Sequence, residues 1–194
     1  MRAVSTMAHL IRTSAPVELY AWLDTDDDLP GWDIFSSNPF TQSQPDDHFT
    51  TVQNYFAEYH LEHYRQRLYK DFPSRLHALT LFATRTDAEN FRVKHPTRVF
   101  GKHLVPARSR GAYVVSFHDS SWLDYLRLPH SMSLATLDEV SEYYWGGRLV
   151  EEVGLTFMDT AWRETPVIEA LFQGTLEPVT YHHHTRTDWL PGFS

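Results

Sequence analysis

The stretch Val167–Val179 reads VIEALFQGTLEPV, and its apolar, β-branched and aromatic residues predict a β-strand. Gly174 inside it indicates a bend or a hairpin. Two further stretches carry the same signal, HALTLFA at His77–Ala83 and AYVVSF at Ala112–Phe117. A short opening strand is expected over His9–Thr13.

Three helices are predicted between these strands, each opened by a capping box in which a threonine and an acid or amide lie three residues apart. The boxes are Thr50–Gln53, Thr86–Glu89 and Thr136–Glu139. The first helix runs to about Tyr69, because Pro73 forbids its extension, whereas Pro96 ends the second and Gly146 closes the third. Helices and strands alternate irregularly, which favours an α+β fold over a doubly wound parallel sheet.

The length and composition predict a single domain over residues 1–194. The chain is 42% hydrophobic and 14% aromatic, so it can form a sizeable core. Residues 24–47 contain several aspartates, Pro30-Gly31, Asn38-Pro39 and Pro45. Turn formers at this density indicate a long loop, and such loops often serve as lids or binding loops.

Charge and cysteine content exclude several functional classes. The absence of cysteine rules out disulfides, thiolate nucleophiles and cysteine zinc sites. The formal net charge is −8, which argues against a general nucleic-acid binder. The N-terminus lacks the apolar core of a secretory signal, and no window approaches 18 uninterrupted apolar residues. A cytoplasmic protein with no membrane partner is therefore expected.

Common catalytic and metal-binding motifs are absent. The chain has no P-loop, no GxGxxG after a strand, no GxSxG elbow and no HExxH helix. The acidic run Asp24–Asp28 lacks the glycine and the glutamate of a calcium loop. Zinc at His182–His184 would need a further ligand from elsewhere, and the alternative is an exposed polar tail. No metal site is predicted.

Two polar features adjoin the predicted strands. Ser74–His77 precedes a strand, so it either faces a ligand at the strand mouth or forms a capped turn with a solvated arginine. Glu169 interrupts an apolar run, and strand alternation puts it on one face with Val167 and Leu171. A carboxylate at a core-facing position needs a partner or a function, unless the strand is an edge and the carboxylate faces water.

Five segments together resemble one known family. They are Met7–Thr13 (MAHLIRT), Phe72–Phe82 (FPSRLHALTLF), the helix Thr86–Lys94, Tyr144–Gly147 (YWGG) and Pro166–Gly174 (PVIEALFQG). In order and character they resemble the motifs of bacterial and phage proteins of the ADP-ribosyltransferase superfamily. The resemblance implies a split β-sandwich with flanking helices, NAD as the substrate, and Glu169 as the catalytic residue.

The chemistry of that family suits a carboxylate at this position. Cleavage of the nicotinamide–ribose bond passes through an oxocarbenium-like state, in which positive charge develops on the ribose. A fixed carboxylate stabilises that charge more than it stabilises the ground state. The arginine-specific branch of the family carries a second glutamate two residues earlier. Val167 stands there in this chain, which argues against modification of arginine.

The resemblance also implies the residues that bind NAD. His9 or Arg12, with the adjacent Thr13, would hold the adenosine ribose or the pyrophosphate. Ser74 would orient the nicotinamide ribose. Arg75 is a second candidate for the phosphates, because a guanidinium binds phosphate through two parallel hydrogen bonds.

The function expected from the resemblance is transfer of ADP-ribose from NAD to a macromolecule, as in a toxin or a phage–host conflict factor. The acceptor is a protein or a nucleic acid, and the acidic composition favours a protein. Tyr64 or Tyr69 would stack on nicotinamide, and an antitoxin or regulator would be a further partner. The alternatives are NAD hydrolysis, a non-catalytic interaction module that docks through residues 24–47, and a metal-dependent hydrolase that uses the histidines.

Overall fold

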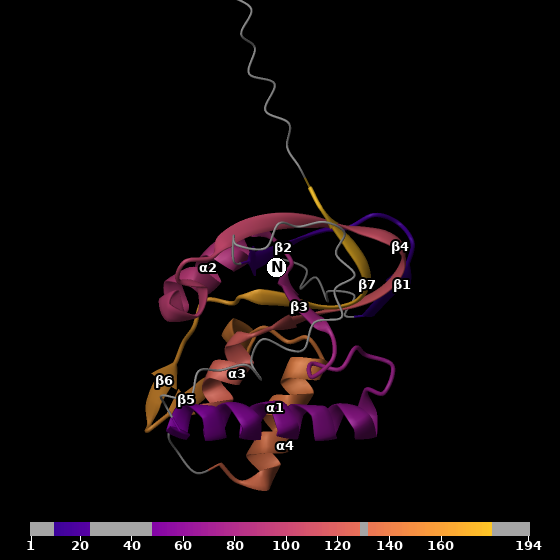
Figure 1. Cartoon of the computed structure of the whole chain (residues 1–194). Helices are drawn as coiled ribbons and strands as arrows, with labels where there is room; N and C mark the ends of the chain where they lie inside the picture. The colour runs from indigo at the N-terminus through magenta and orange to yellow at the C-terminus, as the bar shows by residue number, and fades with distance from the viewer. Residues whose placement is uncertain (1–9, 24–47, 129–131, 180–194) are drawn as a thin grey trace, which may run out of the picture.

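The chain folds as a mixed α/β structure, with a curled sheet in one half and most of the helices in the other (Figure 1). This computed structural model describes residues 10–23, 48–128 and 132–179. The strands are β1 (Leu10–Thr13), β2 (Glu18–Leu23), β3 (Leu79–Phe82), β4 (His103–Asp119), β5 (Leu155–Phe157), β6 (Thr160–Trp162) and β7 (Ile168–Pro178). The helices are α1 (His48–Leu68), α2 (Arg85–Lys94), α3 (Ser121–Leu126) and α4 (Leu134–Trp145), with the 3-10 turns η2 (Pro96–Val99) and η3 (Val150–Glu152).

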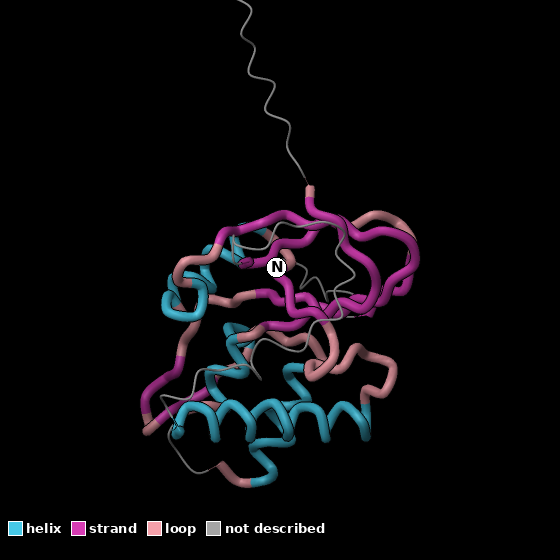
Figure 2. The backbone as a smooth tube through the Cα atoms, viewed as in Figure 1, coloured by secondary structure: helices cyan, strands magenta, loops and turns pink. Residues whose placement is uncertain are grey.

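The long strand β4 organises the main sheet. Its first half pairs with β2 and its second half with β1, while β7 runs along most of its length. β3 lies between β2 and β7, so β4, β2, β3 and β7 close into a small barrel-like ring (Figure 2). Every pairing among the described strands is antiparallel, which agrees with the expectation against a doubly wound parallel sheet.

All three helices start before the expected capping boxes, and α1 begins at His48, so Thr50 already lies inside it. The N-cap of α2 is Thr84, whose hydroxyl accepts a hydrogen bond from the Asp87 amide, and Thr86 already lies inside the helix. Thr84 leaves β3 in an extended conformation, which aims its side chain at the first helical turn. In the same way Ser133, and not Thr136, caps α4. The rule identified the three helices but placed their first residues two or three positions late.

Because side chains alternate between the two faces of β7, this strand contributes residues to two cores. Ala170 and Phe172 point into the barrel and pack with apolar residues of β2, β3 and β4. Leu171 points the other way, into the core that α1, α3 and α4 form below the sheet. Since side chains two positions apart share a face, Glu169 lies on the helix-facing side together with Leu171. The fold therefore directs a carboxylate into the layer between sheet and helices.

β7 does not turn back at Gly174. The strand is continuous to Pro178, and an irregularity in register occurs on β4 between Arg110 and Val114, opposite this glycine. The hairpin expected at Gly174 is therefore wrong. Glycine is required at this position because β4 and β7 approach closely: a Cβ on residue 174 would lie 2.6 Å from the Cβ of Tyr113. The backbone of Gly174 also has a φ of +154°, which residues with a side chain rarely adopt.

Gly174→Ala is expected to lower the free energy of unfolding by about 1–3 kcal/mol, because the added methyl group forces β4 and β7 apart. Denaturant unfolding followed by circular dichroism measures this loss. Gly154→Ala is the control, since nothing lies within 4 Å of its added Cβ. Equal stability of the two variants would show that the strands separate at no cost.

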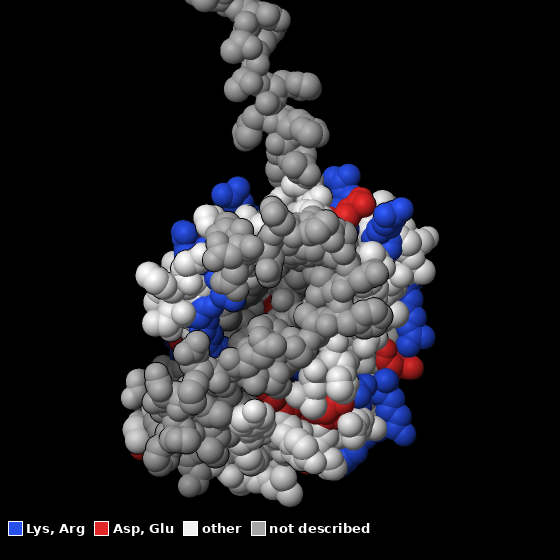
Figure 3. All heavy atoms as spheres, in the orientation of Figure 1, with Lys and Arg blue, Asp and Glu red and all other residues white. Residues whose placement is uncertain are grey.

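Several expectations concern residues outside the described ranges, namely His9, the loop 24–47 and His182–His184. Among the helices of the described ranges, none is long and apolar enough to cross a bilayer. Figure 3 shows Lys and Arg side chains on the left flank of the molecule and along its right edge, with acidic side chains among them.

Candidate functional site

A fully buried arginine, Arg75, lies at the centre of the layer between sheet and helices. Its Nε and Nη2 donate to the two carboxylate oxygens of Glu58, at 2.7 and 3.0 Å. Its Nη1 donates to Oε1 of Glu169 and, at 2.9 Å, to the hydroxyl of Tyr144. Burial opposes the charge of Arg75, but the carboxylates of Glu169 and Glu58 outweigh it, so its pKa lies above the ordinary value.

Four different segments supply these groups. Glu58 comes from α1, Tyr144 from α4 and Glu169 from β7. Arg75 follows Ser74 in the turn that joins α1 to β3, where the Ser74 carbonyl accepts from the backbone amides of residues 77 and 78. The turn directs Arg75 inward, so the solvated arginine weighed from the sequence is wrong.

Glu169 is only 2% exposed. β7 pairs with β3 on one side and β4 on the other at this residue, so an edge strand with a water-facing carboxylate is ruled out. Oε1 of Glu169 accepts from both Arg75 and Tyr144, the latter at 2.7 Å. These two hydrogen bonds hold Oε1, and neither of them involves Oε2. Burial raises the pKa of Glu169 by more than the charge of Arg75 lowers it, so the pKa lies above its usual 4.5.

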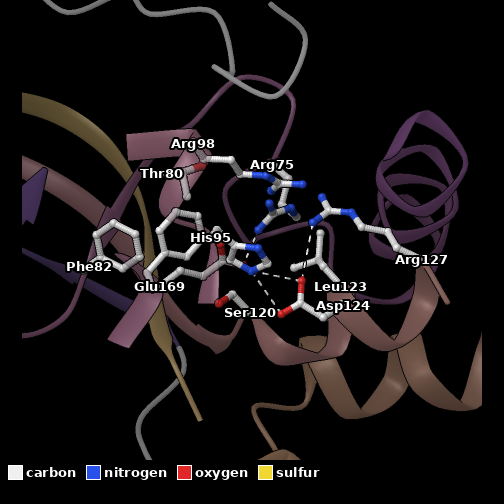
Figure 4. Close-up of a pocket in the computed structure, with 11 residues that line it drawn as sticks. Arg75, Thr80, Phe82, His95, Arg98, Ser120, Leu123, Asp124, Arg127 and Glu169 are labelled. Carbon is white, nitrogen blue, oxygen red and sulfur yellow. Dashed lines mark hydrogen bonds and ion pairs between the residues drawn. The ribbon is translucent and has the colours of Figure 1, made fainter. Parts of the chain in front are cut away.

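A pocket opens beside Glu169. Figure 4 shows three guanidinium groups gathered in it, from Arg75, Arg98 on η2 and Arg127 at the end of α3. The remaining lining residues are Thr80, Phe82, Phe91, His95, Ser120, Leu123, Asp124 and Glu169. The pocket therefore combines a buried carboxylate, cationic groups and an aromatic wall.

The charged residues of the pocket shift one another's pKa values. His95 Nε2 lies 3.2 Å from the Asp124 carboxylate. Burial raises the pKa of Asp124, but the hydrogen bond with His95 and the charges of His95 and Arg127 hold it below the usual value. Burial lowers the pKa of Arg98, and burial together with the charge of Arg98 lowers that of Arg127 to about 10. The two arginines are thus held in surroundings that disfavour positive charge.

Of the residues that the resemblance assigned to the site, Glu169 and Arg75 come together in this pocket. Ser74 precedes Arg75 in the chain and is buried, but its hydroxyl donates to Oε2 of Glu62 at 2.9 Å. Ser74 therefore holds the end of α1 in the described structure and does not line the pocket.

The candidates on β1 lie elsewhere. Arg12 is exposed and pairs with Asp71 at 3.2 Å, and the Thr13 hydroxyl accepts from the amide of Ala15. Neither residue lines the pocket. Their roles in holding NAD remain predictions, as does the role of His9.

The tyrosines expected to stack on nicotinamide also lie away from the pocket and form hydrogen bonds of their own. Both Tyr64 and Tyr69 donate to the carboxylate of Glu142, at 2.9 and 2.8 Å. Each tyrosine pKa is raised, first by burial and then by this carboxylate, to about 12 for Tyr64. They form a cluster between α1 and α4 that is separate from the lining of the pocket.

Sequence reasoning missed the partners of Arg75 and the rest of the pocket. One signal was present: Glu58 and Glu62 lie four residues apart on α1, each beside a buried apolar residue, Ala57 and Leu61. Two acids at the border of an apolar stripe indicate a buried polar contact. Arg98 and Arg127 gave no such signal, because each lies in a short segment without periodicity.

Comparisons by sequence add no family assignment. The chain matches no protein-family model and no curated protein. Over the described ranges, no three His, Asp or Glu side chains gather in a way that could hold a metal ion. The site is therefore judged on its own geometry.

Proposed function

We propose that this protein transfers ADP-ribose from NAD to a macromolecular target, with Glu169 as the catalytic carboxylate. The observation that carries the proposal is the environment of Glu169: it lines a pocket, is almost fully buried, and is held through one oxygen by Arg75 and Tyr144. A carboxylate so fixed in a low-dielectric site is preorganised to stabilise a developing positive charge.

In the proposed reaction the bond between ribose C1′ and the nicotinamide nitrogen breaks, and nicotinamide leaves with the bonding electron pair. Positive charge develops on the ribose and is stabilised by Glu169, whose Oε2 accepts from a ribose hydroxyl. A nucleophile of the acceptor then bonds to C1′ and loses its proton. Arg75 does not cancel the charge of Glu169, because the same guanidinium is shared with Glu58.

The lining of the pocket supports this use, because it combines the carboxylate of Glu169 with the aromatic rings of Phe82 and Phe91. The proposal extends to the fold: the curled antiparallel sheet with helices on one side supports a split β-sandwich with flanking helices.

The proposed partners follow from the composition. A protein acceptor fits the acidic composition, and an antitoxin or regulator would be a further partner.

Incubation with NAD labelled in its adenylate half tests the proposal. Free nicotinamide together with label on protein or nucleic acid is expected. Free nicotinamide with all label in ADP-ribose would identify a hydrolase instead. Intact NAD, in the presence of lysate as a source of acceptors, would refute the proposal.

The acid limb of the NAD-cleaving activity should report the ionisation of Glu169. The raised pKa of this carboxyl group places the limb above pH 4.5, and activity falls as the pH drops through it. Tyr144→Phe should move the limb to higher pH, since the carboxylate loses a hydrogen-bond donor. The pH dependence of kcat/KM measures this shift. Tyr143→Phe is the control, because Tyr143 donates to Glu139 on an exposed helix face; equal profiles for both variants would contradict the assignment.

A further inference from the structure

Three arginines from three separate segments meet in the pocket beside Glu169 (Figure 4). Arg75 comes from the turn before β3, Arg98 from η2, and Arg127 from the C-terminal end of α3. Guanidinium groups repel one another and lose hydration when buried, so such a group of cations is costly without compensating anions.

Acidic side chains of the protein contact Arg75 and Arg127. Arg75 takes both oxygens of Glu58 and one of Glu169 at close range. Arg127 contacts Glu58 at 3.4 Å and Asp124 at 3.8 Å, whereas close charge-assisted hydrogen bonds measure about 2.7–2.9 Å. Burial and the charge of Arg98 lower the pKa of Arg127, so the surroundings disfavour a second cation beside Arg98.

A hydroxyl group in the same pocket provides an independent indication. The side-chain oxygen of Thr80 is buried and has no hydrogen-bond partner within the described residues. Thr80 lines the pocket with Arg98 and Arg127. A buried hydroxyl without a partner costs free energy, which a ligand acceptor would recover.

We propose that Arg98, Arg127 and Thr80 bind a phosphate group. Two guanidinium forks and one hydroxyl donor match the oxygens of a phosphate, and the negative charge relieves the repulsion between the arginines. The assignment of this phosphate to the pyrophosphate of NAD rests on the proposed function, whereas phosphate binding itself does not. It places the pyrophosphate at Arg98 and Arg127 and not at the expected candidates on β1.

Calorimetric titration with inorganic pyrophosphate, ADP-ribose and adenosine tests the site. Pyrophosphate and ADP-ribose are expected to bind, and adenosine, which has no phosphate, is expected to bind far more weakly. Arg98→Gln and Arg127→Gln should each weaken both phosphate ligands by about 10- to 100-fold, as loss of charged hydrogen bonds implies. Arg85→Gln, an exposed arginine on α2, is the control and should leave the affinities unchanged.

Thermal unfolding separates binding from folding. A Tm close to that of the wild type would show that Arg98→Gln and Arg127→Gln are folded, so that any loss of affinity reports on binding. Should an arginine variant fail to fold, Thr80→Val provides the same test without a change of charge and should weaken pyrophosphate binding. Unchanged affinities in the folded variants, or adenosine binding as tightly as ADP-ribose, would overturn the proposal.

The same variants distinguish this site from the proposed function. Loss of pyrophosphate binding in the variants, in a protein that leaves NAD intact, supports the phosphate site and refutes the transferase. Wild-type NAD cleavage by Arg98→Gln and Arg127→Gln, with undiminished ADP-ribose affinity, refutes the site and keeps the transferase.

Discussion

Arg75→Leu is expected to lower the free energy of unfolding by about 3–5 kcal/mol, the cost of breaking a buried ion pair. The substitution keeps most of the volume but leaves Glu58 and Glu169 buried without the cation that both contact. Denaturant unfolding at neutral pH measures the loss. Arg92→Leu is the control, since Arg92 pairs with Glu89 on an exposed helix face, where such pairs contribute about 0–1 kcal/mol.

The pH dependence of this loss has a definite sign. Without Arg75, the pKa of Glu169 in the folded protein rises further above its unfolded value of 4.5. The ionised carboxylate then destabilises the fold above that folded pKa, and the penalty disappears as the pH falls below 4.5. The difference between wild type and variant should therefore shrink on acidification. A difference that is constant with pH would indicate lost packing instead of an uncompensated charge.

Glu169→Gln is expected to reduce NAD cleavage by at least about 10²- to 10³-fold, the usual cost of removing one group that stabilises transition-state charge. Glutamine keeps an oxygen that accepts from Arg75 and Tyr144, and Arg75 retains Glu58 as a charged partner. Tm should therefore change little. Release of nicotinamide under single-turnover conditions measures the effect.

Glu177→Gln is the matched control for this loss, because Glu177 lies on the same strand but is exposed. It should cleave NAD at the wild-type rate. Retained cleavage by a folded Glu169→Gln variant would assign Glu169 a structural role as a partner of Arg75. A large fall in Tm with Glu169→Gln would lead to the same conclusion.

The secondary structure was predictable where one face of an element is polar or where the ends carry breakers. α1 runs from His48 to Leu68, close to the expected span, because Pro73 limits its extension. β2 was missed, since Tyr20 and Trp22 on its outer face pack against apolar residues near α2 and erase the alternation. α3 was missed because six residues are too few for a helical period.

β4 shows how pairing extends a strand beyond its local signal. Only Ala112–Phe117 was predicted, whereas the strand begins at His103. In the first half the exposed Arg108 and Arg110 alternate with the buried Ala107 and Ser109, so the sequence there resembles a polar loop. Hydrogen bonds to β2 and β7 make it a strand.

The sequence alone determined that Glu169 occupies a core-facing strand position and must have a partner or a function. Only the tertiary structure decided that the partner is Arg75, because the two residues lie 94 positions apart in the chain. The tertiary structure alone also brings Arg98 and Arg127 to the same pocket. Local periodicity reports which face of an element is buried, whereas the groups that meet on that face depend on how distant elements pack.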